Sequence, residues 1–251
     1  MSAGKVYFVG AGPGAPDLLT IRAAEVLKRA DVVFHDALVH PDTIALASKA
    51  ECIAVGKRCG RHSTAQRFIN KRLVDAARKA RVIVRLKGGD PMLFGRAQEE
   101  MAALDAAAIA YEVVPGVTAA LAASAEIGVS LTQRGRARSV LFLTPRVGEG
   151  EKPNDWARTA ASADTVVIYM GAGQAEMITQ ALLAQGMRPD TPVVVLENAT
   201  LPDRRCLRLA LLDLPAVAAL GLMGPALIMM GEVYREGVIE HANVVPAARR
   251  A

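Results

Sequence analysis

Short runs of apolar and β-branched residues alternate along this chain with longer stretches rich in alanine and leucine. The short runs have the length and composition of buried strands, and the longer stretches have the length of helices. In the first half, the pattern predicts a helix between most successive strands, which is typical of an α/β fold. The predicted strands span residues 6–9, 32–35, 51–55, 82–86 and 112–114, and the predicted helices span residues 18–29, 42–48, 65–79 and 96–107.

The alternation restarts after Pro115 and Gly116, which we interpret as the junction between two domains. A helix is predicted over residues 117–125, and the polar residues 146–154 are expected to form a loop. Further strands are predicted near residues 139–144, 165–170, 193–197 and 226–231, and further helices near residues 174–185 and 215–221. The sequence therefore predicts two α/β domains, at residues 1–116 and 117–240, followed by a mobile tail at residues 241–251.

The composition is that of a soluble globular protein. Hydrophobic residues make up 52% of the 251 positions, which is enough for a core and excludes a disordered chain. The most apolar region, residues 209–230, is interrupted by Asp213, Pro215 and Gly221, so no membrane span is expected. The start of the chain lacks the layout of a signal peptide, and the 3 cysteines and 4 histidines lack metal-ligand spacing. We expect a cytoplasmic protein without a structural metal.

The charge is basic, with 30 lysine and arginine residues and a net charge of +5. Arginine predominates among them, and its planar guanidinium binds carboxylate or phosphate bidentately. This composition is compatible with an anionic substrate. Nucleic-acid binding is not expected, because the chain has no long basic run and only 4% aromatic residues.

A glycine-rich loop follows the first predicted strand, where Gly10 to Ala15 match the spacing G-x-G-x-x-A. In dinucleotide-binding folds such a loop receives a pyrophosphate at a helix N-terminus. Pro13 and Pro16 argue against that function here, because proline lacks the N–H group that a phosphate needs. Asp17 is a candidate cap or first-turn residue of the helix that follows. The loop is therefore interpreted either as a site for a ligand without phosphate or as a turn without a ligand.

A second glycine-rich segment follows the strand at residues 82–86, and it contains Gly88, Gly89 and Asp90. Ligand sites of open α/β sheets gather at the carboxyl ends of strands. The two glycines would expose backbone groups to a ligand, while Asp90 could equally cap the following turn. Two such loops after two strands predict one shared pocket.

These loops belong to a longer series of motifs that resembles a known family. The series comprises Gly10-Ala11-Gly12-Pro13-Gly14, Asp17-Leu18-Leu19-Thr20, His35-Asp36-Ala37-Leu38-Val39, Val55-Gly56-Lys57-Arg58, Arg85-Leu86-Lys87-Gly88-Gly89-Asp90-Pro91, Val114-Pro115-Gly116-Val117-Thr118-Ala119-Ala120, Tyr169-Met170-Gly171, Glu197-Asn198-Ala199-Thr200 and Pro225-Ala226-Leu227-Ile228. In this order the motifs are similar to those of the uroporphyrinogen-III C-methyltransferases, which belong to the tetrapyrrole methylase superfamily.

The resemblance implies two α/β domains of the tetrapyrrole methylase type with a cofactor cleft between them, and a homodimer. It implies transfer of methyl groups from S-adenosylmethionine, which becomes S-adenosylhomocysteine, to C2 and C7 of uroporphyrinogen III. The product of that family, precorrin-2, serves sirohaem and cobalamin biosynthesis. By motif, the implied cofactor-binding residues are Pro13, Gly88, Gly89, Asp90, Leu93, Thr118, Ala119, Met170, Ala199 and Ala226.

The resemblance also implies two catalytic residues, with Asp36 as proton acceptor and Lys57 as proton donor. A carboxylate and an ammonium suit those roles, because the methylated pyrrole must lose a proton as its conjugation rearranges. Asp36 could instead be a structural acid at a strand end, and Lys57 a surface cation. Uroporphyrinogen is a polycarboxylate, so basic side chains are expected to bind it. The candidates for this are Arg58, Arg61 and Arg134.

The chain departs from the family pattern at Ser130 and Gln133, where a proline and a histidine are usual. Glutamine forms hydrogen bonds but cannot shuttle protons near neutral pH. Methyl transfer is therefore better supported than the exact substrate, and a later precorrin is the next candidate. An NAD-dependent oxidoreductase and a basic nucleic-acid-binding module rank below both of these functions.

Overall fold

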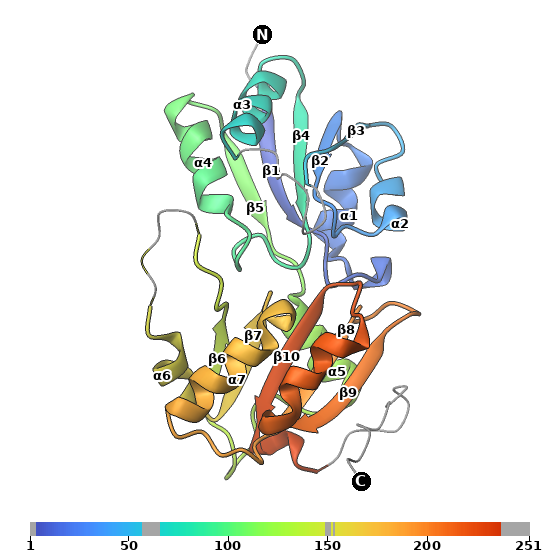
Figure 1. Cartoon of the computed structure of the whole chain (residues 1–251). Helices are drawn as coiled ribbons and strands as arrows, with labels where there is room; N and C mark the ends of the chain where they lie inside the picture. Colours follow the sequence, from blue (N-terminus) through green and yellow to red (C-terminus); the bar gives the residue numbers. More distant parts are fainter. Residues whose placement is uncertain (1–3, 57–65, 149–151, 153, 237–251) are drawn as a thin grey trace. The chain divides into compact units, whose positions relative to one another are not determined.

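The computed structural model describes residues 4–56, 66–148, 152 and 154–236 (Figure 1). The chain divides into two compact units, Met1–Ala119 and Ala120–Ala251. This division lies a few residues after the junction expected from the sequence at Pro115 and Gly116. The tail predicted to be mobile, residues 241–251, lies outside the described residues.

In the described part of the first unit, five parallel strands form one sheet in the order β3-β2-β4-β1-β5. All five strands were predicted, each to within one residue at either end. Parallel pairing follows from the helices that connect them, because a crossover helix returns the chain to the same edge of the sheet. The strands are β1 (Lys5–Gly10), β2 (Val32–His35), β3 (Glu51–Ala54), β4 (Val82–Lys87) and β5 (Tyr111–Val114).

Helices cover both faces of this sheet. The buried residues of α1 (Ile21–Lys28), with Val39 and Ala47 on either side of α2 (Pro41–Ala45), pack against one face. Those of α3 (Gln66–Ala77) and α4 (Ala97–Ala106) pack against the other. The alternation of side chains along β4 explains this, since Val84 and Leu86 face the first group and Ile83 the second.

The predicted helix over residues 18–29 begins later than expected. A short 3₁₀ helix, Pro16–Leu18, is followed by extended backbone at Leu19 and Thr20. The Thr20 hydroxyl then accepts the N–H of Ala23, so Thr20 is the cap of α1. Asp17 does not cap α1, because it lies in the first turn of the preceding 3₁₀ helix.

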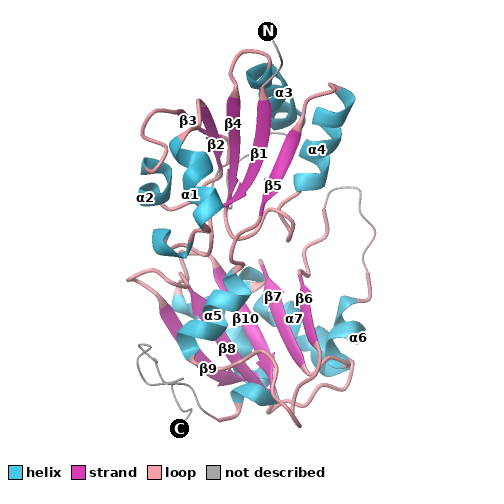
Figure 2. Cartoon of the chain, turned by 180° about the vertical axis from the view of Figure 1, so that it is seen from behind, coloured by secondary structure: helices cyan, strands magenta, loops and turns pink. Residues whose placement is uncertain are grey.

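The described part of the second unit contains a five-stranded mixed sheet in the order β6-β7-β10-β8-β9. β6 and β7 are parallel, and β10 runs antiparallel to β7 and β8. The helix α5 (Ala119–Ile127) lies across one face (Figure 2). The other face is covered by α6 (Trp156–Ala161), α7 (Ala175–Ala184) and a 3₁₀ helix, Leu211–Leu220. The strands are β6 (Val140–Leu143), β7 (Thr165–Tyr169), β8 (Pro192–Glu197), β9 (Arg205–Ala210) and β10 (Ala226–Gly231).

One strand and one α-helix in the described part of the second unit were not predicted. β9 was missed because Arg205 and Arg208 interrupt its apolar pattern; it pairs only with β8 and forms an edge of the sheet. α6 was missed because it is short and follows the polar stretch that was expected to be a loop. The helix expected at residues 215–221 is part of the 3₁₀ helix, whose interior contains Pro215.

Candidate functional site

The candidate residues of the first unit follow four neighbouring strands at one edge of the sheet. Pro13 follows β1, Asp36 follows β2, and Gly88 to Asp90 follow β4. Thr118 and Ala119 follow β5. Because β2, β4, β1 and β5 are adjacent and parallel, their carboxyl ends meet, so the structure brings these residues to the same edge.

The two glycine loops are joined through their backbones. The N–H of Gly12 donates to the carbonyl of Gly89 at 3.2 Å, and the N–H of Gly89 donates to the carbonyl of Gly12 at 2.7 Å. The N–H of Ala11 also donates to the carbonyl of Lys87 at 2.7 Å. Gly12 and Gly89 have φ angles of +73° and +67°, a region that favours glycine. The loops therefore form one continuous backbone surface, the floor of the candidate site, and the shared pocket expected from the sequence stays a prediction.

The backbone of this floor is tightly packed at Gly10 and open at Gly89. A Cβ atom at Gly10 would lie 2.6 Å from the Cα of Gly116 and 2.8 Å from the carbonyl oxygen of Gly89, so the three loops are in close contact there. A Cβ at Gly89 would meet only the Cα of Thr118, at 3.9 Å. The backbone of Gly89 therefore borders open space, and a ligand could approach it.

The Asp90 carboxylate holds two loops in place. One oxygen accepts the N–H of Met92 at 2.8 Å, and the other accepts the N–H of Gly116 at 2.9 Å. These bonds fix the turn after β4 and connect it to the loop after β5. Asp90 thus has the capping function that the sequence left open, and its contact with a cofactor remains a prediction.

Asp36 lies directly beside the Gly88 backbone. Its two carboxylate oxygens accept the N–H of Leu38 at 3.0 Å and the N–H of Gly88 at 3.1 Å. The side chain is partly buried, and each oxygen keeps a lone pair available after these bonds. Asp36 is therefore held in a defined orientation at the floor of the site, as a general base needs to be.

A buried charged cluster lies behind the floor and was not predicted. Glu100 on α4 accepts the Arg85 Nε at 3.1 Å and the Lys87 Nζ at 3.1 Å, and all three side chains are at most 5% exposed. Gln66 on α3 donates to the same carboxylate. Burial, and then the charge of Arg85, lower the pKa of Lys87, and Glu100 opposes this. The sequence could have indicated this cluster, because Arg85 and Lys87 are two residues apart at the end of a predicted strand and therefore lie on one face of β4.

Three predicted residues, Lys57, Arg58 and Arg61, lie outside the described residues. Gly56, the last described residue before them, packs closely against Asp36. A Cβ at Gly56 would lie 2.9 Å from the Cα of Asp36. The roles predicted for Lys57, Arg58 and Arg61 stay predictions.

The candidates of the second unit also gather at one edge of their sheet. Met170 follows β7, Ala199 follows β8, and Ala226 begins β10. They lie at the same edge because β10 is antiparallel to both neighbours, with Leu227 opposite Tyr169 and Ala226 opposite Glu197. Met170 has a φ of +57° and is 44% exposed, so its side chain is available to a ligand.

Two carboxylates hold the loops at this edge. The buried Glu197 accepts the N–H groups of Met223 and Gly224 at 2.6 and 2.7 Å, which fixes the loop that leads into β10. Glu126 on α5 accepts the N–H of Thr200 at 2.9 Å, which fixes the loop after β8. Neither acid was among the predicted site residues.

Arg134 does not lie with this group. It is exposed in a tight turn in which Gln133 and Ala137 exchange backbone hydrogen bonds. The turn precedes β6, which begins beside Thr165 at the amino end of β7, whereas Met170 follows the carboxyl end. Arg134 is therefore at the opposite edge of the sheet, and its role in substrate binding stays a prediction.

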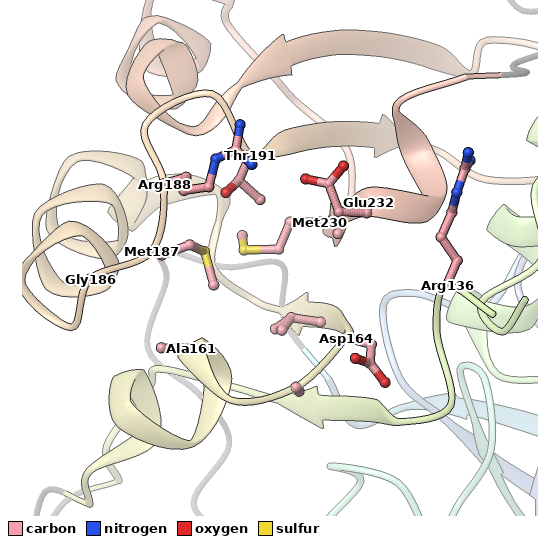
Figure 3. Close-up of a pocket in the computed structure, with 12 residues that line it drawn as sticks. Arg136, Ala161, Asp164, Gly186, Met187, Arg188, Thr191, Met230 and Glu232 are labelled. Atoms are coloured by element: carbon pink, nitrogen blue, oxygen red, sulfur yellow. The ribbon is translucent and has the colours of Figure 1, made fainter.

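A surface pocket of about 280 Å³ lies at this opposite edge (Figure 3). Its charged groups already have partners within the unit. Asp164 accepts the N–H groups of Arg138 and Ser139 and the Ser139 hydroxyl, which lowers its pKa. Arg188 pairs with Asp190 at 2.6 Å. The pocket contains none of the predicted residues, so we do not interpret it as the active site. Its lining includes Arg136, Asp164, Met187, Arg188, Thr191 and Glu232.

The described residues provide neither a metal-binding cluster nor a membrane-spanning helix. No group of three histidine, cysteine, aspartate or glutamate residues among them could hold a metal ion. None of their helices is both long and apolar enough to cross a membrane.

Comparison with known sequences identifies similar proteins. A family model described as Tetrapyrrole (Corrin/Porphyrin) Methylases matches residues 5–215. A siroheme synthase of Tolumonas auensis is 45% identical over 234 residues, which are 92% of this chain and 50% of that protein. A siroheme synthase of Zymomonas mobilis is 43% identical over 231 residues, again 92% of this chain and 49% of that protein. The chain thus spans about half the length of these relatives.

Solved structures give matches of similar extent. The uroporphyrin-III C-methyl transferase of Thermus thermophilus, complexed with S-adenosylhomocysteine, is 40% identical with a TM-score of 0.81. The match covers 92% of this chain and 99% of that one. A cobalt precorrin-4 methyltransferase is 30% identical with a TM-score of 0.82, over 92% of this chain and 96% of that one.

Proposed function

The chain belongs to the tetrapyrrole (corrin/porphyrin) methylase family, and from this premise we propose that it methylates uroporphyrinogen III at C2 and C7 to give precorrin-2. The methyl donor is S-adenosylmethionine. One observation supports the proposal above the others: Gly89, whose backbone is open and joined to the Gly12 loop, directly follows Gly88, whose N–H is accepted by the anchored carboxylate of Asp36. The proposal concerns methyl transfer only, because the siroheme synthases are about twice as long as the matched region.

The floor suits a cofactor that carries no phosphate. Pro13 and Pro16 remove N–H donors that a pyrophosphate would need, while the backbone of Gly89 borders open space. We assign cofactor binding in the first unit to Pro13, Gly88, Gly89, Asp90, Leu93, Thr118 and Ala119. In the second unit we assign it to Met170, Ala199 and Ala226. When bound, S-adenosylmethionine supplies an electrophilic methyl group on a sulfonium.

Asp36 would act as the base. A pyrrole carbon that gains a methyl group must lose a proton as the ring system rearranges, and a carboxylate can accept it. The N–H groups of Leu38 and Gly88 orient the carboxylate, and each of its oxygens still has a lone pair that can accept a proton. Lys57 would return a proton, and Arg58 and Arg61 would bind substrate carboxylates. Positioning of the two reactants supplies much of the remaining acceleration.

The direct test is anaerobic incubation of the purified protein with uroporphyrinogen III and S-adenosylmethionine, followed by mass spectrometry of the tetrapyrrole. We expect a gain of two methyl groups at C2 and C7. A protein that binds S-adenosylhomocysteine but adds no methyl group to uroporphyrinogen III would contradict the proposed substrate.

A second candidate substrate is a later precorrin. The similarity to a cobalt precorrin-4 methyltransferase, and Ser130 and Gln133 in place of the usual proline and histidine, favour it. The same assay with a precorrin of that stage distinguishes the two. Methylation of the later precorrin alone would replace uroporphyrinogen III as the substrate.

We also infer that the protein acts as a homodimer in the cytoplasm, without nucleic acid or membrane as a partner. The basis is the family resemblance and the absence of an aromatic, basic stretch in the sequence. Sedimentation of the purified protein at micromolar concentration tests the dimer, and a monomer at that concentration would contradict it.

A further inference from the structure

The outward face of α3 carries a basic and aromatic cluster that the proposed function does not yet use. Arg67, Phe68, Lys71 and Arg72 are spaced i, i+1, i+4 and i+5, which places them on one side of the helix. The opposite side is formed by Ile69, Leu73 and Ala77, which are buried against the sheet. Phe68 remains 50% exposed although it is aromatic.

The Arg72 guanidinium lies over two aromatic rings. It is 5.4 Å from the centre of the Phe68 ring and 5.8 Å from that of the buried Phe34 ring. Stacking on aromatic rings uses the faces of a guanidinium and leaves its N–H groups at the edge free to donate. An arginine fixed in this manner is prepared to bind a carboxylate bidentately.

The cluster has no acidic partner in the part of the chain that the structure describes. No carboxylate there lies within ion-pair distance of Arg67, Lys71 or Arg72. By contrast, Arg96 and Arg235 each contact a glutamate three residues away on their own chain segment. The positive charge of the α3 cluster is therefore available to an external anion.

The position of the cluster relates it to the candidate site. α3 connects the carboxyl end of β3 to the amino end of β4, so its first two turns begin near the edge where Asp36 lies. Phe34, over whose ring the Arg72 guanidinium lies, is in β2 and precedes Asp36 by two residues, so their Cα atoms lie within about 7 Å of one another. A large ligand at Asp36 could therefore reach Arg72.

We propose that Arg72, whose guanidinium lies over the Phe34 and Phe68 rings, binds a peripheral carboxylate of the tetrapyrrole substrate, and that Arg67 and Lys71 strengthen the local attraction for it. The proposal rests on the proposed function, because it requires a polycarboxylate bound beside Asp36. Arg72 would act in substrate binding and not in proton transfer, so its loss should change substrate affinity and leave the chemical step intact.

The test compares Arg72→Met with Arg78→Met. Arg78 is exposed, lies beyond the far end of the same helix, and its replacement removes the same charge. We expect Arg72→Met to raise the KM for uroporphyrinogen III by about 5- to 20-fold, with kcat and S-adenosylhomocysteine affinity unchanged, as for loss of a charge-assisted hydrogen bond in substrate binding. Arg78→Met should change KM by less than about twofold. Arg72→Lys should recover only part of the loss, because lysine keeps the charge without the planar fork.

Equal effects of Arg72→Met and Arg78→Met would show general attraction by net charge and overturn the proposal, as would an unchanged KM in Arg72→Met. Titration with uroporphyrin, followed by its fluorescence, measures binding without turnover. This titration should show a matching loss of uroporphyrin affinity for Arg72→Met. An unchanged affinity would also overturn the proposal. The proposed function fails separately, since in that case the unaltered protein would not methylate uroporphyrinogen III.

Discussion

The two units of the molecule use different residues to hold the loops of their candidate sites. Each gathers loops at one edge of a five-stranded sheet, and each must hold backbone in conformations that ordinary strands do not use. In the first unit, Gly12 and Gly89 adopt positive φ angles where the two loops meet, which glycine does at little cost, whereas Phe94 and Arg96 adopt them farther along the loop after β4. In the second, Met170, Asn198 and Thr200 adopt them, although each such residue costs about 1–3 kcal/mol.

The second unit offsets this strain with side chains. Asn198 donates from its N–H to the carbonyl of Pro225 and from its side chain to Asp203, and the N–H of Thr200 donates to Glu126. Glu197 holds the neighbouring loop. The comparison teaches that a loop made of glycines is recognisable from sequence, whereas a loop held by distant acids is not.

The largest effect is expected from Gly89→Arg, which fills the open space of the first unit. Arginine at a φ of +67° is strained, and its side chain would occupy the position assigned to the cofactor. We expect S-adenosylhomocysteine affinity to fall by on the order of 100-fold or more while the protein stays folded. Isothermal titration and the thermal unfolding midpoint measure the two properties.

The matched control is Gly135→Arg in the second unit. Gly135 has a φ of +81° and, like Gly89, no close neighbour at the Cβ position, so the backbone strain is comparable. It lies in the turn before β6, away from Met170. Gly135→Arg should keep its affinity for S-adenosylhomocysteine, and retained affinity in Gly89→Arg would remove Gly89 from the cofactor site.

A smaller effect on binding but a large one on turnover is expected from Asp36→Asn. The amide keeps the size of the side chain but cannot accept a proton as a base, so kcat should fall on the order of 100-fold or more. S-adenosylhomocysteine affinity should change little. Asp31→Asn is the control, because Asp31 accepts the N–H groups of Arg81 and Val82 at the other edge of the sheet. Unchanged kcat in Asp36→Asn would make Asp36 a structural acid.

A third comparison concerns the stability lost when the buried carboxylate of each unit, Glu100 or Glu197, is replaced by an amide. Glu100→Gln leaves Arg85 and Lys87 buried without a counter-charge, which should destabilise the first unit by about 3–5 kcal/mol. Glu197→Gln should destabilise less, because one amide oxygen can still accept the N–H groups of Met223 and Gly224. Urea unfolding measures both variants. A loss for Glu197→Gln equal to or larger than that for Glu100→Gln would contradict this ranking.

The difference between loops made of glycines and loops held by distant acids also explains which features the sequence could predict. The five strands of the first unit were visible because each is a short apolar run, and its site was visible because glycines follow those strands at the carboxyl edge. Glu100, Glu126 and Glu197 could not be assigned, because each acts on residues far away in the sequence: 15, 74 and 26 positions in the hydrogen bonds to Arg85, Thr200 and Met223. β9 was hidden by Arg205 and Arg208, whose charges are tolerated on an edge strand.

Each unit has an aspartate just before a strand, Asp31 before β2 and Asp164 before β7, and the smallest effect is expected from replacing the second of these. Asp31 and Asp164 each accept two consecutive N–H groups of a neighbouring segment, at 2.8 to 2.9 Å. The hydrogen bonds from the Arg138 backbone and from Ser139 hold the pKa of Asp164 below its ordinary value of 3.8. A depressed pKa in the folded state stabilises the fold above the ordinary value, and this contribution is lost as the pH falls from 3.8 through the depressed pKa. Asp164→Asn should therefore lower the thermal unfolding midpoint at pH 7, and the difference from the unaltered protein should shrink below about pH 4. A difference that stays constant from neutral pH to about pH 3 would show that the carboxylate charge of Asp164 adds nothing to this contact.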